Sequence, residues 1–496
     1  MRGSIKTVVR LVVFLSVASV LFACSQSTPI SQPTQTVSPT GVAETSQTPS
    51  PTKGSQPTTP PQATVSEVSP ERIAAGQTFA DQFLNRDYAA VVAQFDATMK
   101  SVFPIDKVKE ARESLEPQLG AFKRTAGTRA EKVEQNGIVY DIVYVTWEFE
   151  KAAIDLRIVF DQSGQVAGLF FQPSQSTPPA AYVAPAYVNP DAFREQEVTV
   201  GSGEWALPGT LTLPVGDGPF PVVVLVHGSG ANDRDESLFS SKPFRDLAWG
   251  LASQGVAVLR YEKRNKQHAS KLTEDVVAKL TVQEETVDDA LAAVSLLRQT
   301  NGIDSARVFV LGHSLGGYLL PRIGISDPQI AGLISMAGST RPLEDSLMEQ
   351  AMYIVGLDGT PTPEEEAALD QVAAQVARVK DPSLSAATPA ADSPFGVPAG
   401  YWLDLRGYNP AEVAKKLQMP MLILQGERDY QVTTVDFEGW QSALASRSNV
   451  QFKLYPDLNH LFIAGEGKII PAEYGIEGHV AEQVIVDISE WIKATP

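Results

Sequence analysis

One stretch of the chain combines a serine with glycines at a spacing that suits nucleophilic chemistry. It reads Val308-Phe-Val-Leu-Gly-His-Ser-Leu-Gly-Gly317, a short β-branched strand that runs into Gly312-x-Ser314-x-Gly316. A serine on a sharp turn between a strand and a helix presents its hydroxyl outside the sheet, and glycines let the backbone pass closely. The N–H of Leu315 would lie at a helix N-terminus, where negative charge is stabilised. The spacing favours Ser314 as a nucleophile; an ordinary glycine-rich turn is the alternative.

A serine hydroxyl becomes a good nucleophile only when a base takes its proton and a third group orients that base. We predict that Asp429 is the orienting acid, because it closes the turn after a predicted strand at 421–425. His460 follows the last predicted strand, at 451–455, and is the predicted base. Three other residues compete for these roles: Glu427 and Asp457 as the acid, and His479 as the base.

The transition state also needs donors for the negative charge that develops on the carbonyl oxygen. The turn His227-Gly-Ser-Gly230 follows a predicted strand at 221–226 and can offer a backbone N–H. We expect the N–H groups of Ser229 and Leu315 to form an oxyanion hole, in which one donor is typically worth about 3–4 kcal/mol of barrier. A tight turn without this role is the alternative. We expect no chemical role for the remaining histidines. His227 and His313 are predicted to be structural, and His268 is predicted to be solvated.

Predicted strands and helices alternate from about residue 191 to residue 496. This alternation predicts an α/β fold with a doubly wound, mainly parallel sheet and helices on both faces. An antiparallel hairpin around Pro208-Gly209 is expected to open the sheet. The predicted strands are 198–200, 211–213, 221–226, 256–261, 307–311, 330–336, 421–425 and 451–455, and the predicted helices include 244–253, 286–299 and 481–492.

An insertion at about 337–419 is far longer than an ordinary connection. It follows the sixth predicted strand, so it falls at the carboxyl ends of the strands, where open α/β sheets hold their substrates. Helices are expected at 343–356, 363–380 and 410–417. We interpret the insertion as a helical cap in which Tyr401 and Trp402 contact substrate; a surface excursion without such contact is the alternative.

A smaller unit is predicted at 70–172. Its first half has the apolar spacing of helices, whereas 137–150, 154–160 and 165–172 have the pattern of strands, with a hairpin turn at Asp161-Gln-Ser-Gly164. Helices followed by an antiparallel sheet predict a small α+β domain without a catalytic constellation. By pattern and position it resembles the cystatin-like domains of unknown function that precede some secreted hydrolases. A linker at 173–190 follows it.

The N-terminus has the pattern of an export signal. Arg2, Lys6 and Arg10 precede an apolar run at 11–23, which is too short to span a bilayer as a mature helix. The run ends in Leu21-Phe-Ala-Cys24, which resembles a bacterial lipoprotein signal and implies cleavage after residue 23 and lipidation of Cys24. An ordinary secretory signal is the alternative. Residues 24–69 are rich in Ser, Thr and Pro and predict a flexible tether.

Four segments together resemble a group of bacterial carboxylesterases related to dienelactone hydrolases and to the catalytic domain of prolyl oligopeptidases. They are His227-Gly-Ser-Gly-Ala-Asn-Asp-Arg-Asp-Glu236, Phe244-Arg-Asp-Leu-Ala-Trp249, Leu259-Arg-Tyr-Glu-Lys-Arg264 and Gly312-His-Ser-Leu-Gly-Gly317. The resemblance covers about 195–496. It implies an α/β-hydrolase fold, the chain order Ser, acid, His, and hydrolysis of short acyl esters without a cofactor. The charged residues 232–236, Lys263 and Arg264 are expected to form ion pairs around the site.

These observations predict an exported, lipid-anchored serine esterase that acts on a small-molecule ester through Ser314, Asp429 and His460. No cofactor and no metal are expected. The formal net charge of −18, without a dense Lys/Arg run, argues against nucleic acid as a partner. The alternatives are a peptidase related to prolyl oligopeptidases, and an envelope lipoprotein that binds a ligand through 70–172. The sequence carries no signal for an oligomeric state.

Overall fold

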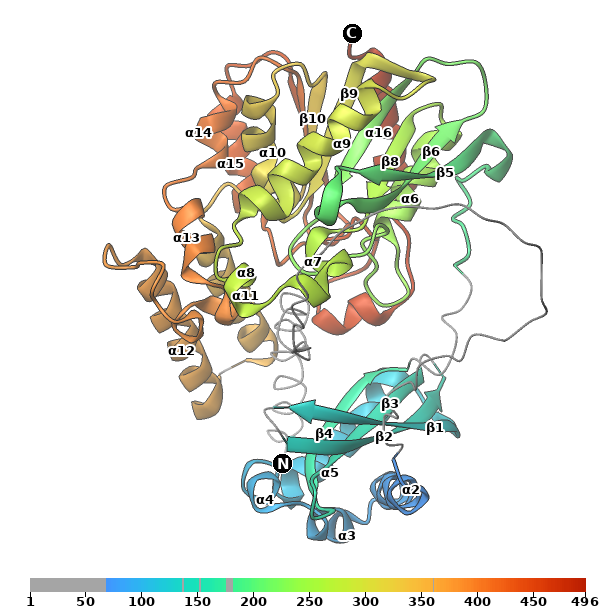
Figure 1. Ribbon diagram of the computed structural model, residues 1–496, viewed down its shortest axis with the longest axis vertical. Helices are drawn as coiled ribbons and strands as arrows, with labels where there is room; N and C mark the ends of the chain where they lie inside the picture. Colours follow the sequence, from blue (N-terminus) through green and yellow to red (C-terminus); the bar gives the residue numbers. More distant parts are fainter. Residues whose placement is uncertain (1–67, 136–137, 151–152, 175–181, 360) are drawn as a thin grey trace, which may run out of the picture.

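The computed structural model describes residues 68–135, 138–150, 153–174, 182–359 and 361–496 (Figure 1). The predicted export signal, Cys24 and nearly all of the predicted tether lie outside the described residues. None of the described helices is long and apolar enough to cross a membrane. The described residues form two folded units, each with its own sheet and its own hydrophobic core.

The smaller unit packs helices against a four-stranded antiparallel sheet of order β1-β2-β3-β4. Its elements are α2 (Pro70–Leu84), α3 (Tyr88–Ala93), α4 (Ala97–Val102), α5 (Ile105–Leu119), β1 (Phe122–Gln135), β2 (Ile138–Phe149), β3 (Ala153–Phe160) and β4 (Val166–Pro173). Phe79, Phe83 and Trp147 are fully buried in its core. Val68 is buried and Ser69 caps α2, so the folded unit begins two residues before the predicted boundary.

The strand β1 was not predicted, and the reason is its composition. It is an edge strand that pairs only with β2, so one of its edges faces no other strand. Charged residues on an edge strand discourage pairing with another chain, and β1 carries Lys123, Arg124 and Arg129 among others. These residues hide the alternation of apolar side chains on which the prediction of strands depends. The hairpin predicted at Asp161–Gly164 is present, because Asp161 N–H donates to the Gln165 carbonyl.

The predicted linker is partly a structural element of the larger unit. Tyr182 donates a hydrogen bond to the carboxylate of Asp246, which is fully buried, and Tyr187 OH donates to the Val480 carbonyl at 2.8 Å. The second half of the predicted linker therefore packs on the larger unit. Two tyrosines in a Pro- and Ala-rich segment carry enough apolar area to dock on a helical surface.

The larger unit is built on an eight-stranded sheet of order β12-β11-β10-β9-β7-β8-β6-β5. Only the pairs β5–β6 and β6–β8 are antiparallel, as the predicted fold requires. The strands are β5 (Phe193–Val200), β6 (Leu207–Pro214), β7 (Phe220–Val226), β8 (Ala257–Tyr261), β9 (Ile303–His313), β10 (Gly332–Met336), β11 (Met421–Gly426) and β12 (Val450–Tyr455). The opening hairpin is confirmed, but its turn lies at 201–206. Pro208-Gly209 lies inside β6, opposite Thr199 and Val198.

Helices cover both faces of this sheet (Figure 1). Along β7, Val222, Val224 and Val226 belong to one core and Val223 and Leu225 to the other, as expected for a strand that is buried on both faces. The first core includes side chains of α9 (Asp288–Arg298), α10 (Leu315–Ser326), α14 (Pro410–Ala414) and α15 (Thr434–Leu444), and the second those of α6 (Pro243–Ser253) and α16 (Glu482–Ala494). Shorter elements are α7 (Arg264–Gln267), α8 (Glu274–Val277) and the π-helical turn η4 (Gln283–Val287).

The insertion between β10 and β11 is helical, as predicted. It contains α11 (Leu343–Val355), α12 (Pro363–Lys380), α13 (Ala399–Leu405) and α14. Thr362 begins α12 with a capping box, in which its hydroxyl accepts from Glu365 N–H and Glu365 accepts from Thr362 N–H. Leu347, Val379, Ala399 and Trp402 form a small core that joins α11, α12 and α13. The cap therefore has packing of its own.

Candidate active site

The candidate nucleophile Ser314 lies on the turn between β9 and α10. Its backbone has φ +52° and ψ −114°, a region that non-glycine residues rarely adopt. The two glycines of the motif are required by close approach. A Cβ on Gly312 would lie 2.3 Å from the Gly316 carbonyl carbon, and a Cβ on Gly316 would lie 2.3 Å from the Val226 carbonyl oxygen. Ser314 is half-buried.

The turn that follows β7 lies directly against the nucleophile. A Cβ on Gly228 would be 3.1 Å from the Cβ of Ser314. The Gly228 carbonyl accepts hydrogen bonds from Lys263 Nζ at 2.7 Å and from Asn232 Nδ2 at 3.2 Å, which hold the turn in place. Within the described residues, the N–H groups of Ser229 and Leu315 donate no hydrogen bond to the protein. Both predicted oxyanion donors are thus free to bind a ligand.

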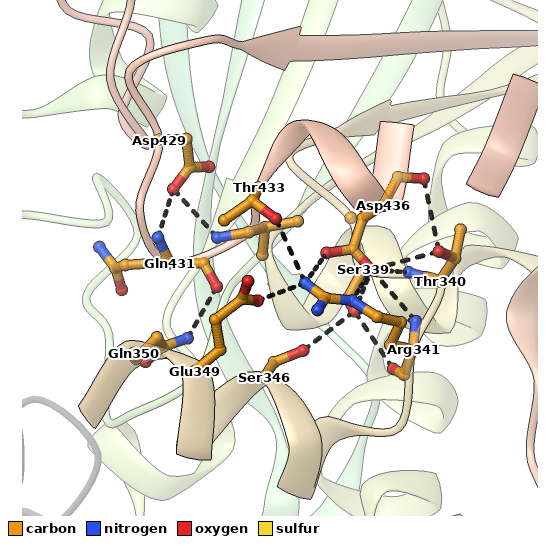
Figure 2. Close-up of polar contacts among 12 residues, drawn as sticks. Ser339, Thr340, Arg341, Ser346, Glu349, Gln350, Asp429, Gln431, Thr433 and Asp436 are labelled. Carbon is orange, nitrogen blue, oxygen red and sulfur yellow. Dashed lines mark hydrogen bonds and ion pairs between the residues drawn. The ribbon is translucent and has the colours of Figure 1, made fainter. Parts of the chain in front are cut away.

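The predicted acid and base are in contact. Asp429 follows β11 and His460 follows β12, and Asp429 Oδ2 lies 2.6 Å from His460 Nδ1. Both side chains are buried. The second carboxylate oxygen, Oδ1, accepts the N–H groups of Gln431 at 2.8 Å and Val432 at 3.0 Å (Figure 2). The backbone of its own turn therefore fixes the acid, and the acid in turn orients the imidazole.

The residues that compete for the roles of acid and base lie outside the contact between Asp429 and His460. Glu427 and Asp457 are exposed. His479 Nδ1 lies 3.1 Å from Asp246, a buried residue of α6, and its ring packs edge-on against Tyr182. His268 was predicted to be solvated, which is wrong. It is buried, with Nε2 3.0 Å from the Ala206 carbonyl and its ring edge-on to Trp205.

The four predicted groups follow β7, β9, β11 and β12, which all run in the same direction. They therefore meet at the carboxyl edge of the sheet, where open α/β folds bind their ligands.

Comparison with known proteins shows the family of this chain. Residues 218–466 match the family described as serine aminopeptidase, S33. The chain is 38% identical over 414 residues to esterase EstD of Thermotoga maritima, an alignment that covers 84% of this chain and 93% of EstD. The chain belongs to the esterase-like α/β-hydrolases. It is an enzyme of the carboxylesterase type. Residues 76–169 match a separate family of proteins of unknown function.

Two solved structures are similar to part of this chain at low identity. Est1E from Butyrivibrio proteoclasticus is 15% identical, with 60% of this chain and 98% of that one covered and a TM-score of 0.38. The acylaminoacyl peptidase of Pyrococcus horikoshii is 14% identical, with 77% and 57% covered and a TM-score of 0.43.

One buried ion pair joins three parts of the hydrolase site. Glu236 Oε1 accepts the Gly228 N–H at 2.6 Å, and Oε2 lies 2.9 Å from His313 Nδ1. His313 Nε2 in turn donates to the His460 carbonyl at 2.9 Å. Burial alone would lower the pKa of His313, but the Glu236 carboxylate outweighs burial and raises it. Burial likewise opposes the charge of Glu236, yet His313 holds the pKa of that carboxyl below its usual value.

Other residues of the predicted charged set also form ion pairs. Arg260 pairs with Asp235, Arg264 Nη2 lies 2.5 Å from Asp289, and Arg234 Nε lies 2.8 Å from Glu262. His227 is neutral, because burial and, to a smaller extent, Lys263 lower its pKa to about 4. Its Nε2–H can therefore donate to the Asp233 carbonyl, 3.0 Å away.

The predicted cap residues Tyr401 and Trp402 both line a cavity that Ser229 also lines. Tyr401 OH donates to Glu285 at 3.0 Å. Burial and the Glu285 carboxylate raise the pKa of Tyr401 well above its usual value, so the phenol keeps its proton. Sequence reasoning missed Glu285 and Asn265, which also line the cavity, because neither lies in a recognisable motif. No group of His, Cys, Asp and Glu suited to a metal ion occurs among the described residues.

Proposed function

We propose that this enzyme hydrolyses short-chain carboxylic esters by an acyl-enzyme mechanism. Ser314 Oγ bonds to the acyl carbon while His460 takes its proton, and the alcohol leaves with that proton as the C–O bond breaks. Water then attacks the acyl carbon, gives a proton to His460, and releases the acid as Ser314 regains its hydrogen. The N–H groups of Ser229 and Leu315 stabilise the oxyanion in both steps.

The observation that carries this proposal is the 2.6 Å contact between Asp429 and His460. It holds the imidazole with Nδ1 toward the acid, so that Nε2 is available for a proton from the serine. The close approach of Gly228 to Ser314 adds an oxyanion turn beside the nucleophile. EstD, which is named an esterase, supports the ester as substrate class.

Ser314→Ala is the first test. The purified chain is expected to cleave p-nitrophenyl acetate and butyrate, and the variant is expected to lose at least about 10⁴-fold in kcat, since the covalent step has no substitute. Asp429→Asn should also lose several orders of magnitude, because the imidazole loses its orienting partner. Circular dichroism and an unchanged unfolding midpoint would show that Ser314→Ala still folds. Turnover equal to wild type in that variant would refute the mechanism.

A serine aminopeptidase is the second candidate, because that is the description of the family matched at 218–466. Aminoacyl p-nitroanilides with a free amine, compared with p-nitrophenyl esters under the same conditions, separate the two functions. Faster cleavage of the anilides would favour the peptidase.

We also propose export and lipid anchoring at Cys24. The support is the order of basic residues, apolar run and cysteine at 2–24. Mass spectrometry of the mature N-terminus is expected to find a diacylglyceryl group on Cys24, and Cys24→Ser should release the enzyme from membranes. A Cys24→Ser protein that stays in the membrane fraction would contradict the anchor.

A further inference from the structure

A cavity of about 100 Å³ lies beside the oxyanion turn, since Ser229 and Gly230 form part of its wall. Most of the remaining wall is apolar and comes from α8, the loop after it and the cap, including Leu280, Leu347 and Val397. Gly228, the neighbour of Ser229, approaches Ser314 closely. The cavity is therefore placed to receive the part of a substrate attached to the reacting carbonyl. A space of this size holds only a few non-hydrogen atoms.

One side of the cavity is polar. Glu285 comes from the π-helical turn η4, a type of irregularity that is frequent at functional sites. Its Oε1 accepts Asn265 Nδ2 at 2.6 Å and its Oε2 accepts Tyr401 OH at 3.0 Å. Lys263 Nζ lies 3.6 Å from Oε1, and both charged side chains are buried. Since the two charges balance, this side of the cavity offers hydrogen bonds and no net charge.

Two buried polar atoms of the cavity residues have no partner. Asn265 is 5% exposed, and its Nδ2 donates to the Gly230 carbonyl at 3.2 Å as well as to Glu285. The Gly230 carbonyl and the Glu285 carboxylate are both acceptors, so Nδ2 of Asn265 must face them. The amide oxygen, Oδ1, then faces away from both and makes no hydrogen bond to them. Among the described residues, neither Asn265 Oδ1 nor Trp402 Nε1 has a hydrogen-bond partner. One is an acceptor and the other a donor, and buried polar groups of this kind are ordinarily satisfied.

We propose that this cavity binds the acyl part of the ester and selects a short acyl group that carries a hydroxyl. A hydroxyl both donates and accepts, so it can donate to Asn265 Oδ1 and accept from Trp402 Nε1–H. An ammonium only donates and would leave the indole N–H without a partner. A carboxylate only accepts, so it would leave Asn265 Oδ1 without a donor. The inference rests on the proposed function, since it assumes that Ser314 attacks the ester.

The test compares p-nitrophenyl esters of 3-hydroxybutyrate, butyrate and 3-aminobutyrate with the full chain. The kcat/KM for the hydroxy ester is expected to exceed that for butyrate at least about 10-fold, because a site with unpaired polar groups rejects the analogue that cannot satisfy them. Trp402→Phe keeps an aromatic ring and removes the unpaired N–H together with the rest of the five-membered ring, so its unfolding midpoint is measured beside the kinetics. Trp402→Phe and Asn265→Ala should each lower the hydroxy/butyrate ratio at least about fivefold. Asn449→Ala, an exposed asparagine after α15, is the matched control and should keep the wild-type ratio.

The outcomes are separable. A wild-type ratio near one, a preference for the amino ester, or a ratio unchanged in Trp402→Phe would overturn the inference while Ser314-dependent ester cleavage stands. Ester cleavage that persists in Ser314→Ala would instead refute the proposed function.

Discussion

The ion pair between Glu236 and His313 connects the oxyanion turn, the nucleophile elbow and the loop of the base through single atoms. Glu236 accepts a hydrogen bond from the Gly228 N–H, and His313 donates one to the His460 carbonyl. The pKa of His313 is higher in the folded protein than its ordinary value of 6.5. A histidine of this kind contributes stability that is fully present below its unfolded pKa and is lost as the pH rises through its folded pKa. The pair therefore links the integrity of the site to pH on the alkaline side.

Glu236→Gln should remove this dependence. At pH 6 the variant is expected to unfold with a free energy about 1–3 kcal/mol below wild type, because a buried charge-assisted contact is lost. The gap should narrow as the pH rises through the raised pKa of His313, since the wild type then loses that proton. Urea unfolding at a series of pH values from 6 upward measures the gap. Glu262→Gln is the matched control, because its partner Arg234 stays charged throughout. A gap for Glu236→Gln that stays constant over the whole pH range in which the wild type is folded would contradict a charged His313.

At the scale of elements, the buried carboxylate of Asp436 holds the first residues of the cap by hydrogen bonds. Asp436, near the start of α15, is fully buried. It accepts the Ser339 hydroxyl and the Thr340 N–H, each at 2.9 Å, and the Arg341 guanidinium at 2.7 Å (Figure 2). From α11, Gln350 Nε2 donates to the Gln431 carbonyl at 2.9 Å, in the turn that follows Asp429. The start of the cap and the acid turn are thus connected by hydrogen bonds.

Asp436→Asn is predicted to lower the free energy of unfolding by about 3–5 kcal/mol, since it leaves Arg341 without its buried partner. The KM for esters should rise as the cap loses its anchor. Glu349→Gln, on the more exposed side of the same arginine, should cost less than about 1 kcal/mol. Chemical unfolding and steady-state kinetics of the two variants give the comparison. Equal costs would mean that Asp436 does not anchor the cap.

At the scale of the whole molecule, the segment before β5 belongs to the hydrolase. Tyr182 and Tyr187 reach α6 and the strand-to-helix connection at Val480. The small α+β unit has a separate core drawn only from its own residues. Removal of the small unit alone should therefore leave the hydrolase stable, whereas removal of the tyrosines should not.

Two shortened chains test this. A chain that begins at residue 175 is expected to keep the unfolding midpoint and ester turnover of the full-length hydrolase. A chain that begins at residue 190 should lose about 1–3 kcal/mol, because Asp246 and the Val480 carbonyl lose their phenolic donors. Tyr182→Phe/Tyr187→Phe in the full-length chain should reproduce part of that loss. Two shortened chains with the same midpoint would show that the tyrosines contribute nothing.

Sequence reasoning succeeded where a local pattern has one physical cause. Strand and helix positions of the large sheet follow from buried apolar runs such as Pro221–Val226, and the contact between Asp429 and His460 follows from the places of both residues after strands. Prediction from the sequence failed where the surroundings of a residue are formed by residues distant in the chain. The polar edge strand β1, the buried His268 and the docked Tyr182 each depend on neighbours remote in the chain.

The amino-acid sequence by itself determined the turn that carries Ser314, because a Cβ on Gly312 or on Gly316 would clash with the backbone of Gly316 or of Val226. It also places Ser314, Asp429 and His460 in the chain order expected for α/β-hydrolases. Only the tertiary structure decided which residues line the cavity beside Ser229. Glu285, Asn265 and Trp402 come from η4, α7 and α13, and no local pattern links them. Folding brings all three to the wall of one cavity, and within the described part of the chain burial leaves two of their polar atoms without a partner.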